Sequence, residues 1–136
     1  MILCDTGPLV ALIDSRQGEA HDNCRAIVDN LRDTLHTTWP CVTEAMYLAH
    51  KIGGWQMQGI LWRLLASAAF DFCPIDRSLS ARMETLMARY RSVPMDMADA
   101  SLVVAAERLG VRRIFTLDSD FLIYRFDDGG CFDVIP

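Results

Sequence analysis

The chain has 136 residues, of which 51% are hydrophobic, so it is long enough to build one domain around a substantial core and is not expected to be disordered. Its net charge of −5 argues against a protein that binds nucleic acid through a broadly positive surface. It does not exclude a nuclease, because a metal ion in the site supplies positive charge locally. No apolar run approaches the roughly 20 residues of a transmembrane helix, and the first residues lack the basic start of a signal peptide. We therefore expect a cytoplasmic protein that makes no membrane contact.

In chain order, the hydrophobic pattern alternates short strands with helices. It predicts a strand over residues 2–4, helices over 9–13 and 19–32, a strand over 35–39, and a helical hairpin over 44–52 and 55–69 that Thr43 caps and Gly53-Gly54 interrupts. A strand over 70–75, helices over 78–90 and 96–109, and strands over 113–117 and 131–135 complete the series. Pro74 favours an edge position for the third strand. This order predicts a single three-layer α/β domain over residues 1–136, with a central parallel sheet of about five strands flanked by helices.

Four acidic residues stand at corresponding places in this pattern. Asp5 and Asp118 directly follow predicted strands, and Glu44 and Asp99 open predicted helices. Residues just beyond the strand carboxyl ends of an open parallel sheet line one crevice, where ligands bind. Each acid alone has an ordinary explanation as a turn former or a first-turn residue. Together they predict a site for Mg²⁺ or Mn²⁺, since these ions prefer oxygen ligands.

Electrostatics supports the same interpretation. Two carboxylates ~5 Å apart repel by roughly 3 kcal/mol at an effective dielectric of ~20, so several of them need protons or a cation. Three nearby residues have more than one explanation each. Asp96 is either a further site acid or a helix N-cap, and Asp120 is either a site acid or part of a solvated turn. Thr6 binds a carboxylate, positions the substrate by binding a phosphate, or only satisfies the turn.

The chemistry of such a site suits phosphoryl transfer, because a metal ion can activate water and stabilise charge on a phosphate. No G-x-S-x-G motif is present, and neither the five cysteines nor the three histidines show a metal or redox spacing. Two alternatives remain. A phosphatase-type enzyme on a similar sheet would want a second Asp where Gly7 stands or a Lys near a late strand, and a non-catalytic interaction module usually loses the site acids.

The segments that hold these acids resemble those of the PIN-domain nucleases, especially the VapC-like toxins of toxin–antitoxin pairs. The matching runs, in family order, are ILCDTGPLVAL (2–12), TE (43–44), MADASL (97–102) and FTLDSDF (115–121). The resemblance implies endonucleolytic cleavage of RNA with Mg²⁺ or Mn²⁺, a homodimer, and inhibition by a cognate antitoxin protein. By this match the catalytic, metal-binding acids would be Asp5, Glu44, Asp99 and Asp118. Thr6 would occupy the position where the family has a small hydroxyl residue, and Asp120 would occupy a position that is often acidic in relatives.

Two further expectations concern contacts with partners. Arg77, Arg82, Arg89 and Arg112 are candidates to hold phosphate groups, since Arg binds phosphate through two hydrogen bonds. The predicted helix that begins near Trp55 carries more large apolar side chains, Met57 and Trp62 among them, than one core-facing stripe requires. We expect part of a dimer or antitoxin contact there.

Overall fold

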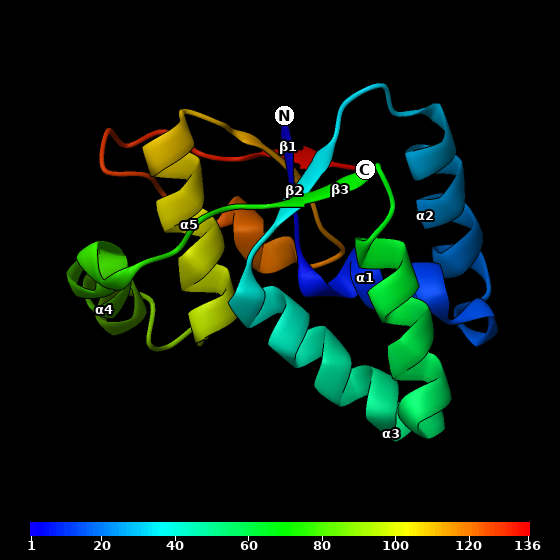
Figure 1. Ribbon diagram of the computed structural model, residues 1–136. Coiled ribbons are helices and arrows are strands. Elements are labelled where there is room, and N and C mark those ends of the chain that lie inside the picture. Colours follow the sequence, from blue (N-terminus) through cyan, green and yellow to red (C-terminus); the bar gives the residue numbers. More distant parts are fainter.

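The computed structural model describes all 136 residues and contains one parallel sheet with helices on both faces (Figure 1). Its five strands run in the order β3-β2-β1-β4-β5, and every neighbouring pair is parallel. The strands are β1 (Ile2–Cys4), β2 (Leu35–Thr37), β3 (Phe70–Phe72), β4 (Arg113–Phe115) and β5 (Asp133–Ile135). The predicted three-layer α/β architecture is confirmed, and β3 lies at the sheet edge as Pro74 suggested.

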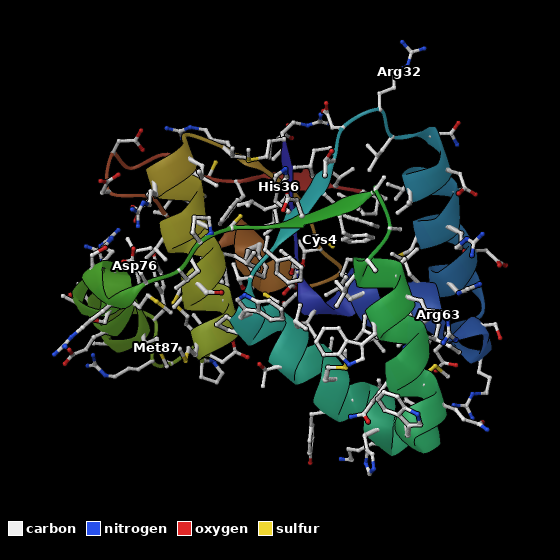
Figure 2. The ribbon with its side chains drawn as sticks, viewed as in Figure 1. Cys4, Arg32, His36, Arg63, Asp76 and Met87 are labelled. Carbon is white, nitrogen blue, oxygen red and sulfur yellow. The ribbon has the colours of Figure 1, made fainter.

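Each face of the sheet has its own hydrophobic core. Side chains alternate along β1, so Ile2 and Cys4 pack into one core and Leu3 into the other. Helices α1 (Thr6–Ile13), α2 (Glu19–Asn30) and most of α3 (Trp39–Leu65) cover the first face; α4 (Ser80–Arg89) and α5 (Met97–Leu109) cover the second. Figure 2 shows Cys4 in the interior, while Arg32 projects away from the molecule. No helix combines the length and the apolar character needed to cross a membrane.

Helix α5 is buried over most of its length. Its residues 98–106 are all buried, which is what a helix that is apolar on every side requires. Asp96 caps its N-terminus and Gly110, with φ of 65°, ends it in the left-handed conformation that glycine adopts easily. This helix begins and ends within a residue of its predicted bounds.

Helix α3 starts five residues earlier than predicted. The hydroxyl of Thr38 accepts a hydrogen bond from the N–H of Cys41, and Pro40 sits in the first turn, where its missing N–H is not needed. The expectation that Thr43 caps a helix beginning at Glu44 is therefore wrong, and Glu44 lies in the second turn. The predicted hairpin is present, because Gly53 and Gly54 have non-helical dihedral angles and divide α3 into two arms (Figure 1).

The remaining differences are at the ends of helices and strands and at one cysteine. Helix α1 begins at Thr6 rather than at residue 9, α2 ends at Asn30 rather than at residue 32, α3 ends at Leu65 rather than at residue 69, and α4 spans Ser80–Arg89 rather than residues 78–90. Strands β2, β3, β4 and β5 are each two or three residues shorter than predicted, because the residues at those ends belong to helix starts and loops. Four cysteines are buried, whereas Cys131 is exposed and lies in the loop before β5 rather than in the predicted strand.

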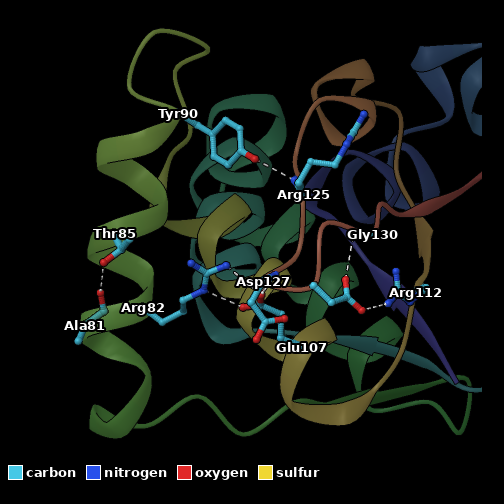
Figure 3. A network of polar contacts seen from close by, with 10 residues as sticks. Ala81, Arg82, Thr85, Tyr90, Glu107, Arg112, Arg125, Asp127 and Gly130 are labelled. Carbon is cyan, nitrogen blue, oxygen red and sulfur yellow. Dashed lines mark hydrogen bonds and ion pairs between the residues drawn. The ribbon is translucent and has the colours of Figure 1, made fainter.

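The C-terminal loop is fastened to the α4–α5 layer by a network of charged groups (Figure 3). Arg82 on α4 donates to both carboxylate oxygens of Glu107 on α5, at 3.0 and 2.9 Å. The N–H of Asp127 in the loop donates to the same carboxylate at 2.7 Å, and Arg112 pairs with Asp128. This network holds the chain segment that follows Asp118 against the second core.

Candidate active site

A pocket of about 420 Å³ lies where β1 and β4 end and where α5 begins. It brings together all four acids predicted from the sequence. Its lining consists of Asp5, Thr6, Gly7, Glu44, Leu48, Asp96, Asp99, Leu117, Asp118 and Ser119. Asp120 is not among the lining residues. The prediction that the strand carboxyl ends gather these acids in one crevice therefore agrees with the geometry.

Asp5 forms the floor of this pocket. It caps α1: its Oδ1 accepts the N–H of Thr6 at 2.7 Å, and its Oδ2 accepts the hydroxyl of Thr116 at 2.8 Å. Burial raises the pKa of Asp5 to about 6, against the lowering effect of these two hydrogen bonds, and the negative charges of Glu44 and Asp118 raise it further. The two hydrogen bonds therefore fix the orientation of the Asp5 carboxyl group, while burial makes its charged form less stable.

Thr116 joins two of the acids, and the sequence analysis missed it. Its buried hydroxyl donates to Asp5 and accepts the N–H of Asp118 at 3.0 Å. The carboxylate of Asp118 in turn accepts the N–H of Asp120 and begins the short turn η3 (Ser119–Leu122). A polar residue at the end of an apolar strand, two positions before an acid, was the available signal.

Glu44 and Asp99 are each held by a neutral hydroxyl. The hydroxyl of Thr6 lies 3.2 Å from both Oε2 of Glu44 and the carbonyl oxygen of Cys41, so it is engaged within the protein. Burial, followed by the charge of Asp96, raises the pKa of Glu44. The hydroxyl of Tyr124, also missed from the sequence, donates to Oδ2 of Asp99 at 2.7 Å.

Asp99 is the most perturbed of the four acids. Burial raises its pKa to about 7 despite the hydrogen bond from Tyr124, and the charges of Asp96, Asp5 and Asp118 add to the effect. Asp96 is the N-cap of α5, because its side chain accepts the N–H of Asp99 at 2.8 Å. It also lines the pocket, so the two explanations given for it from the sequence are compatible.

No positive side chain compensates this concentration of acids. None of the ion pairs in the structure involves an acid that lines the pocket. The four Arg candidates do not line it either, and two of them are paired elsewhere, Arg82 with Glu107 and Arg112 with Asp128. The pocket therefore offers net negative charge to a ligand.

The donor set fits a hard divalent cation. It consists of carboxylate oxygens with no cationic neighbour, and burial raises the pKa of Asp5, Glu44 and Asp99. Mg²⁺ and Mn²⁺ favour oxygen ligands of this kind. The acids line the pocket walls, and no three of the His, Cys, Asp and Glu side chains are gathered closely enough to hold an ion as they stand. Coordination would require the carboxylates to move toward the ion or water to complete its shell.

A second hollow of about 740 Å³ adjoins the acidic pocket and shares Glu44 and Asp96 with it. Its wall includes the exposed side chains of Trp39, Tyr47 and Met97. The ring of Trp39 stacks on Phe72 with centroids 4.3 Å apart. The acids therefore lie beside an open aromatic surface, so an extended ligand can contact both.

Comparison with known proteins agrees with this geometry. Residues 2–127 match the PIN domain, so the chain belongs to the PIN domain family. Over 136 residues it is 29% identical to a curated relative, ribonuclease VapC26 of Mycobacterium tuberculosis, with 99% of this chain and 100% of the relative covered. Its fold is similar to that of Mycobacterium tuberculosis VapC20, whose crystal structure is described as that of a toxin cleaving the sarcin–ricin loop. The TM-score is 0.82 at 15% identity, and both chains are covered completely.

These findings confirm the resemblance drawn from the four sequence motifs. Membership of the PIN domain family also argues against the phosphatase-type alternative. The fold, the order of the motifs and the pocket that they form all describe the same kind of molecule.

Proposed function

We propose that this protein is a metal-dependent endoribonuclease and the toxin of a toxin–antitoxin pair. The observation that carries the proposal is the pocket lined by Asp5, Glu44, Asp99 and Asp118, whose charges no cation of the protein compensates. The proposal is supported by the family match and by the relative named a ribonuclease.

The four acids would hold one or two Mg²⁺ or Mn²⁺ ions. A bound ion of this kind supplies an activated water and stabilises charge on the phosphate and the leaving oxygen. The chain's own residues would orient the reaction: Thr116 and Thr6 fix Asp5 and Glu44, and the exposed Asp118 at the pocket wall can accept a hydrogen bond from the attacking water. Unpaired bases can stack on the aromatic wall formed by Trp39 and Tyr47.

We also propose that the protein works in the cytoplasm as a homodimer and that a cognate antitoxin inhibits it. The second arm of α3 supports a protein contact, because Trp55 is 70% exposed and Trp62 46% exposed, with Ile60 between them. Large apolar side chains of this kind are enriched at interfaces. The prediction that this arm carries partner contacts stays a prediction.

RNA cleavage by the purified protein tests the function. We expect cleavage of single-stranded RNA in Mn²⁺ and none in EDTA, and we expect Asp5→Asn and Asp99→Asn to lose at least 100-fold in rate while they keep the wild-type circular dichroism. Asp71→Asn is the matched control, because Asp71 is an exposed carboxylate outside the pocket and should leave the rate unchanged.

Two results would overturn the proposal. Either acid variant cleaving RNA at the wild-type rate would show that the site is misassigned. A folded wild-type protein that neither cleaves RNA nor binds Mn²⁺ would favour the non-catalytic interaction module.

A further inference from the structure

Tyr124 is a completely buried residue whose hydroxyl contacts Asp99, one of the acids that line the pocket. It follows the turn η3 and donates to Oδ2 of Asp99 at 2.7 Å, 25 positions away along the chain. The hydroxyl thus connects the start of α5 with the segment that carries Asp118. None of the matching motifs includes Tyr124.

The ring of Tyr124 has little freedom to move. It packs edge to face against Tyr90 and Phe121, with ring centroids 5.1 and 5.3 Å away. The N–H of Tyr124 also donates to the carbonyl oxygen of Asp120 at 3.4 Å. A ring held in this way presents its hydroxyl at one fixed point, so the bound carboxylate oxygen is fixed as well.

The two oxygens of Asp99 are in different situations. Oδ2 is occupied by Tyr124, whereas Oδ1 accepts no hydrogen bond from the protein. No buried side-chain oxygen in the structure lacks a partner, so Oδ1 must be open to the pocket that Asp99 lines. One oxygen is therefore anchored by a neutral donor and the other is left for a ligand.

We propose that Tyr124 is a positioning residue, whose hydroxyl holds the Asp99 carboxylate so that Oδ1 faces a divalent cation in the pocket. The proposal rests on the metal site of the proposed function. Groups that orient a metal ligand from behind typically contribute 10–100-fold to metal affinity or activity. A hydroxyl that only satisfied the core would contribute to folding and leave the ion unaffected.

The test compares Tyr124→Phe with Tyr90→Phe. Both variants remove one phenolic hydroxyl from the same aromatic cluster and keep the ring, but the hydroxyl of Tyr90 accepts the N–H of Arg125, away from the acids (Figure 3). Mn²⁺ affinity is measured directly, by calorimetry and by the free-ion signal in electron paramagnetic resonance. We expect Tyr124→Phe to bind Mn²⁺ about 10–100-fold more weakly than wild type and Tyr90→Phe to bind like wild type.

RNA cleavage at increasing Mn²⁺ gives a second readout. We expect Tyr124→Phe to require more Mn²⁺ for half-maximal rate, with the KM for RNA unchanged at saturating metal. Because loss of the hydroxyl can also weaken the fold, p-aminophenylalanine placed at position 124 provides a rescue, since its amino group keeps a donor at the same place. We expect it to recover most of the Mn²⁺ affinity.

The outcomes separate this inference from the proposed function. If wild type binds Mn²⁺ and Tyr124→Phe binds it equally well or more tightly, the positioning role is wrong while the metal site stands. Equal losses in Tyr124→Phe and Tyr90→Phe would also overturn it, because they would reflect a loosened cluster. If wild type itself binds no Mn²⁺, the proposed function fails first.

Discussion

The metal-free protein should lose stability as the pH rises, because its pocket buries carboxylates whose charged forms are disfavoured. The pKa of Asp5 is raised to about 6 and that of Asp99 to about 7, both from 3.8. A folded state with raised pKa values binds more protons than the unfolded chain, so its stability falls as the pH rises from about 4 through about 7. One pKa unit corresponds to about 1.4 kcal/mol. Between pH 5 and pH 8 we expect a loss of about 2–4 kcal/mol, most of it from Asp99.

Replacing Asp99 by Asn tests this reasoning. The variant removes the charge, and its amide oxygen can still accept the hydroxyl of Tyr124. At pH 8 in EDTA we expect Asp99→Asn to be more stable than wild type by about 1–3 kcal/mol, and most of this advantage should disappear at pH 5, where Asp99 is protonated in the folded state. Millimolar Mn²⁺ should reverse the order, because an ion that binds only the folded state stabilises the wild type more.

The measurement is urea unfolding followed by circular dichroism at pH 5, 6, 7 and 8, in EDTA and in Mn²⁺. Asp71→Asn controls for the loss of one exposed carboxylate and should follow the wild-type pH dependence. An Asp99→Asn protein that is less stable than wild type at pH 8 in EDTA, with an unchanged pH slope, would show that the acid is structural and that the electrostatic argument is mistaken.

Three further substitutions test other parts of the structure. Thr116→Val removes the hydroxyl that donates to Asp5, so it should lower Mn²⁺ affinity about 10–100-fold by calorimetry and destabilise the fold by about 1–3 kcal/mol in urea. Arg82→Ala leaves the half-buried Glu107 without its cationic partner and should lower stability by about 1–3 kcal/mol, more than any exposed Arg variant does. Trp55→Ser should change the melting temperature by no more than about 2 °C from that of the wild type, because substitutions at exposed sites have small effects on stability. It should weaken self-association, which sedimentation velocity measures.

The layers of the fold could be predicted because the hydrophobic pattern records which faces are buried. Alternation in Ile2, Leu3 and Cys4 identifies a strand between two cores, and the uncharged stretch after Asp99 identifies a buried helix. The start of α3 could not be predicted in the same way. In a sequence, Pro40 is equally consistent with the end of a strand and with the first turn of a helix. The hydrogen bond from the N–H of Cys41 to the hydroxyl of Thr38, which only the structure shows, identifies it as part of a helix.

The acids of the pocket could be predicted, but most of what holds them could not. Asp5 and Asp118 follow from strand ends and Asp99 from a helix start, because parallel strands bring those positions to one edge. Glu44 was predicted at a helix start but reaches the pocket from the second turn of α3. Their partners depend on distances across the fold: the hydroxyl of Thr116 meets a carboxylate 111 positions away. No local pattern encodes such a contact.

The chemistry of these partners supports the proposed metal site. Three acids, Glu44, Asp5 and Asp99, are held by the hydroxyls of Thr6, Thr116 and Tyr124 in turn, rather than by Lys or Arg. Asp5 also accepts one backbone N–H. A cationic side chain would relieve the repulsion within the protein alone, would lower the pKa values of the acids, and would compete with any ion for their charge. A neutral donor fixes the orientation of a carboxylate and leaves its negative charge available. The protein therefore retains an electrostatic penalty in the absence of a ligand, and the ligand that relieves it most fully is a small, hard cation.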